Sequence, residues 1–158
     1  MNMGQHTGKC EFEVSPHICE LTGRMEATLF EVGGYPPTGI IRTDQEWGVR
    51  VNWCIEGHLI HHLCGEFCIC VYIECIGAGP EKTLKCVRVP FDPCGNGCYS
   101  VDITIPAGAI DAGACQDCGQ VCCLAVTLTS FDPCQKSGHI AAFCKGPCVM
   151  FTLPAHSN

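Results

Sequence analysis

The sequence predicts an all-β protein, built as a single antiparallel β-sandwich of about seven to nine strands. Apolar and polar residues alternate with a period of two over several segments, which is the pattern of half-buried strands. The 18 glycines and 10 prolines fall at short intervals, usually where a turn would separate two such segments. No window shows the sustained three-and-four spacing of an amphipathic helix. Short strands separated by frequent turns are typical of a β-sandwich or barrel.

Five segments carry the clearest alternation and are the expected central strands. They are residues 47–55, 66–76, 98–105, 121–131 and 148–153. Weaker alternation predicts further strands at residues 25–32, 39–42, 82–90 and 139–143. In the first central strand, Trp47 and Trp53 fall on the same face, which we expect to point into the core because burying a large side chain is worth roughly 1.5–3 kcal/mol.

Turn residues separate the predicted strands. Asn96-Gly97 predicts a tight reversal, because this dipeptide readily adopts the positive φ angles of hairpin turns. The tetrapeptide Phe-Asp-Pro-Cys occurs twice, at 91–94 and 131–134. Because the flanking segments do not match, we interpret the two copies as similar turns ending two strands and not as an internal repeat. Gly146-Pro147 predicts another turn.

The length predicts one domain, with an arm at its start. We expect residues 1–22 to form an N-terminal arm and residues 23–158 to form the sandwich. The arm contains Cys10 and Cys19 among apolar residues. Such an arm is able to add a strand to the sheet edge of a neighbouring molecule, where a disulfide would lock it.

Cysteine is the most unusual feature of the composition, at 17 of 158 residues. This density is typical of disulfide scaffolds in oxidising compartments. The odd number leaves at least one thiol without an intramolecular partner. The first 15 residues lack the basic and apolar regions of a signal peptide. We therefore expect an extracellular or cell-surface location from the composition, with a cytoplasmic one left open by the N-terminus.

Three cysteines are predicted on the outer faces of strands, because neighbouring positions in a strand point in opposite directions. They are Cys54, Cys68 and Cys70, whereas Cys75 should face inward. Cross-strand disulfides within the chain, or a covering loop, would explain them. A face buried against another subunit, or bonded to it, would also explain them, and metal binding is a third alternative.

Short cysteine spacings suggest a second kind of site. Cys94, Cys98, Cys115 and Cys118 form two closely spaced pairs about twenty residues apart, as in sites for zinc or another soft metal. Local disulfides that clip two turns are the alternative. A redox enzyme that uses Cys115 and Cys118 would require a βαβ context, which the sequence does not predict.

Histidines provide no stronger site. His58, His61 and His62, together with Cys64, have the residue types of a metal site, but we favour a solvated loop between two strands. His139 is a possible base for a cysteine nucleophile, although no spacing places it near one. No carboxylate pair is placed for acid–base work, and no glycine loop is placed to bind phosphate. We therefore expect no enzymatic activity and no bound cofactor.

Charge and hydropathy limit the partners. Charged residues make up 16% of the chain, hydrophobic residues 47%, and the net charge is −7. Nucleic-acid binding is not expected, because it requires a basic surface. No membrane span is expected, since no apolar run reaches about 18 residues. A surface poor in charge favours association, so the expected partners are copies of the same chain, in a homo-oligomer or polymer.

The strand number and turn spacing resemble the immunoglobulin-like β-sandwich class over about residues 23–154. Trp53 on an early central strand and Tyr99 on a later one have the character of the core aromatics of that class. The resemblance implies a fold and no activity. The function expected is that of a non-enzymatic, cysteine-rich structural subunit that self-associates into a surface or extracellular assembly stabilised by disulfides. The alternatives are a metal-binding protein and a thiol–disulfide redox protein.

Overall fold

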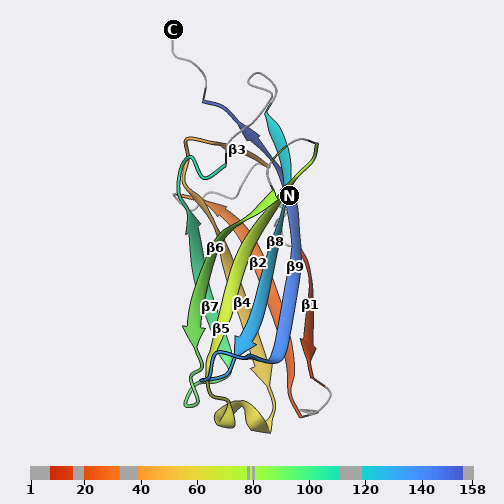
Figure 1. The fold of residues 1–158 in the computed structure, drawn as a ribbon, viewed down its shortest axis with the longest axis vertical. Helices are drawn as coiled ribbons and strands as arrows, with labels where there is room; N and C mark the ends of the chain where they lie inside the picture. The colour runs from red at the N-terminus through yellow and green to blue at the C-terminus, as the bar shows by residue number, and fades with distance from the viewer. Residues whose placement is uncertain are drawn as a thin grey trace, which may run out of the picture.

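The computed structural model describes residues 8–15, 20–32, 39–77, 79, 81–110 and 119–154, and the fold is all-β (Figure 1). The nine strands are β1 (Lys9–Val14), β2 (Thr22–Glu31), β3 (Ile40–Arg42), β4 (Trp47–Glu56), β5 (Glu66–Cys75), β6 (Glu81–Pro90), β7 (Cys98–Ile105), β8 (Gln120–Phe131) and β9 (Ser137–Thr152). One short 3-10 helix, η1 (His58–His62), lies between β4 and β5. The predicted strands at 47–55, 66–76, 98–105 and 121–131 correspond to β4, β5, β7 and β8.

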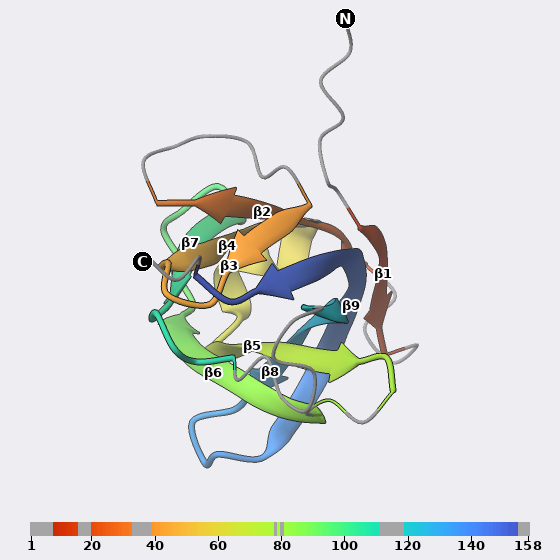
Figure 2. The same ribbon diagram turned by 90° about the horizontal axis from the view of Figure 1, so that it is seen from above.

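The strands form two sheets that pack as a sandwich, and the end-on view of Figure 2 shows the two layers. One sheet has six strands, in the order β1-β9-β8-β5-β6, with β3 beside β9. The other sheet has the order β2-β4-β7. All neighbours pair antiparallel except β3, which runs parallel to β9. The predicted antiparallel sandwich of about seven to nine strands is confirmed.

The core between the sheets is built from the faces that the alternation predicts. Trp47 and Trp53 on β4 are 2% and 1% exposed. The Trp53 ring stacks on Tyr99 of β7 at 5.3 Å and meets the edge of Phe67 of β5 at 5.3 Å, so it joins the two sheets. Trp47 packs against Phe151 of β9 at 5.6 Å. Ring contacts of this kind add stabilisation beyond the burial of area.

One local prediction is wrong. The turn expected at Gly146-Pro147 does not form, and the strands expected at 139–143 and 148–153 are one strand, β9. The register of β8 against β9 shifts here, so that Leu124 alone faces the two residues Gly146 and Pro147. Proline lacks an N–H for the ladder, and a bulge is a position that tolerates this loss. The solvated loop expected after β4 contains the helix η1.

The segment expected as an arm contains β1, which pairs along its whole length with β9 of the same chain. Lys9 faces Lys145 and Val14 faces Ile140. Residues 1–7 and 16–19 lie outside the described residues. The described part of this segment therefore forms an outer strand of the six-stranded sheet.

Lysine side chains connect the outer strand β6 to β7 and to the segment that follows β7. Lys82 Nζ donates a hydrogen bond to the carbonyl oxygen of Ala109 at 2.6 Å, and Lys85 Nζ donates to that of Thr104 at 3.0 Å. Lysines on an outer strand also discourage pairing with another chain. Within the described residues, no helix has the length and apolar character that crossing a membrane requires.

Candidate functional site

Among the described residues, five disulfides connect cysteines that lie directly opposite each other on neighbouring strands. Each bonded pair is also a pair in the strand register, so the backbone ladder itself brings the sulfurs together. The bonds are Cys10–Cys144, Cys54–Cys98, Cys70–Cys86, Cys75–Cys122 and Cys123–Cys148.

Four of these bonds join successive strands of the six-stranded sheet, two on its core face and two on its outer face. They connect β1 to β9, β9 to β8, β8 to β5 and β5 to β6, so every neighbouring pair along the path β1-β9-β8-β5-β6 carries a cross-link. The fifth connects β4 to β7 in the smaller sheet. Among the described residues, no disulfide joins one sheet to the other. The cross-links therefore resist separation of neighbouring strands within a sheet, while side-chain packing and the hydrogen bonds of Lys82 and Lys85 act between the layers.

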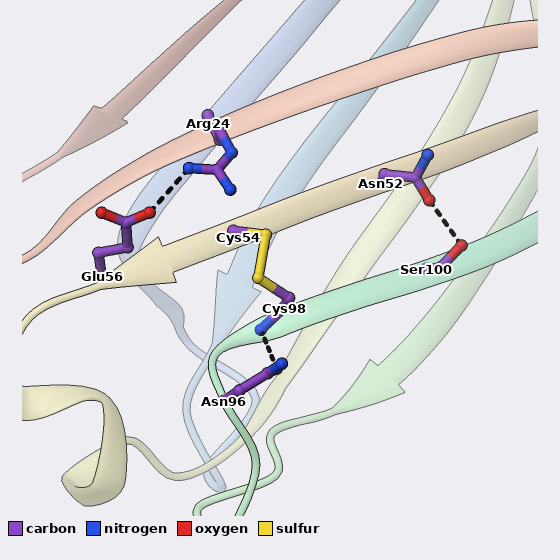
Figure 3. Close-up of a disulfide and its surroundings, with 7 residues drawn as sticks. All are labelled: Arg24, Asn52, Cys54, Glu56, Asn96, Cys98 and Ser100. Carbon is purple, nitrogen blue, oxygen red and sulfur yellow. Dashed lines mark hydrogen bonds and ion pairs between the residues drawn. A yellow bond between two sulfur atoms is a disulfide. The ribbon is translucent and has the colours of Figure 1, made fainter.

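Figure 3 shows the bond of the smaller sheet in its surroundings. Cys98 begins β7, and its backbone N–H donates to the side-chain oxygen of Asn96 at 3.0 Å, which fixes the preceding turn. Further along the same face, Ser100 Oγ donates to Asn52 Oδ1 at 2.7 Å. This outer face of β4 and β7 is thus covered by paired polar groups and one disulfide.

The three cysteines predicted on outer faces have different partners. Cys54 and Cys70 form cross-strand disulfides within the chain, with Cys98 and Cys86. Cys68 is unpaired and half-buried on β5, beside Cys70. Phe67, Ile69 and Val71 of β5 are fully buried, so the sulfurs of Cys68 and Cys70 lie on the opposite face, as the alternation predicts. Cys75 faces the core, where it bonds Cys122.

The cysteines predicted as metal ligands are not gathered in the described structure. Cys98 is bonded to Cys54, and Cys94 is an exposed, unpaired thiol. Cys115 and Cys118 lie outside the described residues, as does the arm cysteine Cys19. The other arm cysteine, Cys10, is bonded to Cys144.

A different set of sulfurs does come together. The Sγ atoms of Cys68, Cys70 and Cys86 lie within 4.8 Å of one another, and those of Cys68 and Cys70 are 3.8 Å apart. Sequence reasoning placed Cys68 and Cys70 on one face but missed Cys86. The missing information was the register of β5 against β6.

Three exposed, unpaired cysteines lie in loops at one end of the sandwich. They are Cys64, Cys94 and Cys134. Cys64 precedes the start of β5, Cys94 follows the end of β6, and Cys134 follows the end of β8. The register pairs Glu66 with both Pro90 and Phe131, so these strand ends are adjacent. In Figure 1 this is the lower end, which also carries η1.

Two of these thiols sit in matching turns, made by the two Phe-Asp-Pro-Cys segments. The carbonyl oxygen of Asp92 accepts from the Gly95 N–H at 3.1 Å, and that of Asp132 accepts from the Gln135 N–H at 2.9 Å. In each turn Asp, Pro and Cys occupy the first three positions. Type I turns favour Asp at the first position and Pro at the second. The interpretation of two similar turns is confirmed, and each turn presents its cysteine to solvent.

The histidines predicted as an alternative metal site lie at the same end. His61 Nδ1 donates to the carbonyl oxygen of Pro93 at 2.8 Å, which holds η1 against the β6–β7 turn. His139 lines a small hollow together with Cys64 and Asp132. The hollow holds about 80 Å³, against roughly 300–1,000 Å³ for ligand pockets. Within the described part of the chain, Cys64 and His139 are not hydrogen-bonded to each other.

Several charged groups form pairs at the surface. Arg50 donates two hydrogen bonds of 2.7 Å to the carboxylate of Asp102, and these bonds lower the pKa of Asp102 and raise that of Arg50. The Arg88 guanidinium binds Glu66 and Gln135, and the hydrogen bond from Arg88 is the largest cause that lowers the pKa of Glu66. Surface pairs of this kind contribute little stability individually.

Comparison with solved structures gives a fold likeness only. The chain resembles the C-terminal domain of wzt with a TM-score of 0.51 at 7% identity, over 96% of this chain and 80% of that one. It also aligns with a β-glucosidase from Listeria innocua in complex with glucose, with a TM-score of 0.43 at 12% identity, over 90% of this chain and 16% of that one. No family model matches the chain, and no curated protein matches it.

Proposed function

We propose that this chain is a non-enzymatic structural subunit that self-associates through intermolecular disulfides at the thiol-bearing end of the sandwich. We define this end by Cys64, Cys94 and Cys134. The single observation that carries the proposal is the repeated turn, which presents an exposed, unpaired thiol twice at the same end. A buried structural cysteine would be inert, whereas an exposed thiol is available for exchange.

The disulfides between successive strands of the six-stranded sheet support the structural part of the proposal. A sheet in which each neighbouring strand pair is covalently joined resists unfolding, because disulfides restrict the unfolded chain. Disulfides persist in oxidising compartments, which favours a cell surface or extracellular assembly. The low charged fraction, 16%, favours contact between molecules.

The position of the thiols defines the kind of oligomer. All three described exposed thiols lie at one end, so a bond between copies joins end to end. Such a contact uses the same surface on both partners and closes into a dimer, whereas head-to-tail contacts extend into a filament. We therefore expect covalent dimers as the main product.

The immunoglobulin-like character of the sandwich is part of the same proposal. The contact between Trp53 and Tyr99 across β4 and β7 supports it. In antibody domains a disulfide joins the two sheets, and here the described disulfides lie within sheets. Disulfides within each sheet are suited to a structural subunit, because they keep neighbouring strands covalently joined.

Non-reducing gel electrophoresis and light scattering test the proposal. Wild-type protein is compared with the triple variant Cys64→Ser, Cys94→Ser, Cys134→Ser after oxidation. We expect a covalent dimer from the wild type and a monomer from the triple variant. Cys68→Ser removes an unpaired thiol that is not at this end and should leave the dimer intact. A wild-type protein that is monomeric by both methods contradicts self-association, and a triple variant that still dimerises covalently contradicts the proposed position of the link.

A further inference from the structure

We propose that Cys68, Cys70 and Cys86 form a thiol–disulfide exchange site on the outer face of β5 and β6. In this site the Cys68 thiolate opens the Cys70–Cys86 disulfide and leaves Cys86 as a reactive thiolate. The ligand class that the site takes is a molecule carrying a disulfide, which Cys86 then attacks. The proposal is independent of self-association at the thiol-bearing end.

The first support is proximity. The unpaired Cys68 Sγ lies 3.8 Å from Cys70 Sγ, and the third sulfur, that of Cys86, is within 4.8 Å of both. Cys68 and Cys70 are two positions apart on β5, so both side chains leave the same face. Cys86 lies directly opposite Cys70 on β6. Among the described residues, this is the disulfide with an unpaired thiol beside it.

The second support is the difference in exposure between Cys68, which attacks the disulfide, and Cys86, which the exchange releases. Cys70 is buried, at 8% exposed, and Cys68 is half-buried, whereas Cys86 is exposed on the outer strand β6. The attacking sulfur must come into line with the bond that breaks, which requires side-chain rotation of Cys68 and Cys86. Exchange therefore moves the free thiol from a half-buried position to a solvent-accessible one.

The chemistry balances without an external oxidant or reductant. The Cys68 thiolate attacks Cys70 Sγ, a Cys68–Cys70 bond forms, the Cys70–Cys86 bond breaks, and the electron pair leaves on Cys86 Sγ. Cys86 then attacks the disulfide R–S–S–R of the ligand to give Cys86–S–S–R and the thiolate R–S⁻. The Cα atoms of residues two apart in a strand are about 6.4–6.8 Å apart, which is within the range that a disulfide spans.

The third support is the local structure. The pairing of β5 with β6 shifts register between Val71 and Tyr72, one residue beyond Cys70. Bulges occur frequently beside functional sites, because they loosen the ladder and redirect side chains. Arg88 lies opposite Cys68 in the register. The Arg88 guanidinium is held by hydrogen bonds to Glu66 and Gln135, which places a fixed positive charge on the strand beside this site.

Alkylation of the folded, monomeric protein without reductant tests the exchange. A maleimide is added, and labelled residues are identified over time by non-reducing peptide mapping. We expect label on Cys86, together with a Cys68–Cys70 disulfide, at a rate at least tenfold higher than in Cys68→Ser. The matched control Cys134→Ser also lacks one unpaired thiol and should label Cys86 at the wild-type rate. Equal Cys86 labelling in the wild type and Cys68→Ser overturns the proposal.

A second variant tests the product directly. In Cys86→Ser, oxidised glutathione should convert Cys68 and Cys70 to a disulfide and release two glutathione thiols. In peptide mapping, the peptide that contains Cys68 and Cys70 should lose two hydrogens in mass and carry no glutathione, whatever the exposed thiols at the other positions do. A stable glutathione adduct on Cys68 or Cys70 shows that this bond cannot form in the fold, and it also overturns the proposal.

Discussion

Cys10 of β1 and Cys144 of β9 face each other across the sheet and form a disulfide between residues 134 positions apart in the sequence. Cys144 is fully buried in the core, and Cys10 packs against the core from the outer strand. This one bond therefore attaches the start of the described chain to its last strand, and it anchors β1 against the sandwich.

Removing this bond should loosen β1 before the rest of the fold. We predict that Cys10→Ser with Cys144→Ser lowers the free energy of unfolding by about 3–5 kcal/mol, since the entropic effect of a disulfide increases with the loop that it closes. Urea denaturation measures the loss, and hydrogen exchange should show the largest change in β1. The double variant Cys70→Ser, Cys86→Ser, which opens a separation of 16, is the control and should lose less. Equal losses contradict this account.

The indole of Trp53 has an unusual environment, because its Nε1–H is buried without a hydrogen-bond partner. An unpaired buried donor costs about 1–3 kcal/mol. Trp53→Phe removes that donor and should therefore cost only about 1 kcal/mol in unfolding free energy, despite the lost volume. Trp53→Ala removes the ring contacts as well and should cost about 3–5 kcal/mol. Thermal or urea unfolding compares the two, and a Phe variant as unstable as the Ala variant is the contrary result.

The Arg50–Asp102 pair predicts a pH dependence of stability. The hydrogen bonds from Arg50 lower the pKa of Asp102 below the ordinary value of an aspartate side chain. A lowered carboxyl pKa adds stability above the unfolded-state pKa, and this contribution disappears as the pH falls through the folded-state pKa. Asp102→Asn should therefore weaken the loss of stability below about pH 4. Arg50→Lys, which keeps the charge but not the two-pronged geometry, should lie between this variant and the wild type.

Urea midpoints at pH 6 and at a series of pH values below 4 measure this effect. The pair is partly exposed, so its contribution should decrease as salt is added. Identical pH profiles for the wild type and Asp102→Asn would show that the pair does not contribute.

The hydrogen bonds that Lys82 and Lys85 of β6 donate across to the other sheet should limit local opening of β7. Lys82→Met with Lys85→Met keeps the side-chain length but removes both donors to the carbonyl oxygens of Ala109 and Thr104. A net contribution of about 1 kcal/mol per bond, or about 2 kcal/mol for both, corresponds to roughly thirtyfold faster hydrogen exchange in β7, together with increased aggregation. Lys9→Met is the control, because Lys9 has only a weak 4.0 Å ion pair with Glu11. Unchanged exchange in β7 contradicts a stabilising role for these bonds.

The sequence predicts the strands well because alternation is a local property. The faces of β4 and β5, including the inward Cys75 and the outward Cys68, follow directly from a period of two. The disulfides could not be predicted, because pairing depends on which strands become neighbours. Cys70 reaches Cys86 through the next strand in the chain, but Cys10 reaches Cys144 only after the whole sandwich has formed.

The gathering of exposed thiols at one end of the sandwich could not be predicted from the sequence for the same reason. The repeated Phe-Asp-Pro-Cys segment is visible in the sequence and predicts two similar turns. Whether Cys94 and Cys134 share an end depends on the direction of the strands before them. The antiparallel register of β5 with both β6 and β8 provides this information. Gly146-Pro147 misled the prediction because a bulge in β9 accommodates residues that usually mark a turn.

Non-reducing peptide mapping of the native protein tests the central claim most directly, because the proposed role requires cross-links within each sheet and free thiols at one end. The predicted map contains Cys10–Cys144, Cys54–Cys98, Cys75–Cys122 and Cys123–Cys148, with Cys70 bonded to Cys86 or, after exchange, to Cys68. Cys64, Cys94 and Cys134 should appear as free thiols or in bonds between copies. Two results would contradict the central claim. One is a disulfide within one chain between any two of Cys64, Cys94 and Cys134, and the other is a map in which the cysteines of the predicted cross-strand disulfides are reduced.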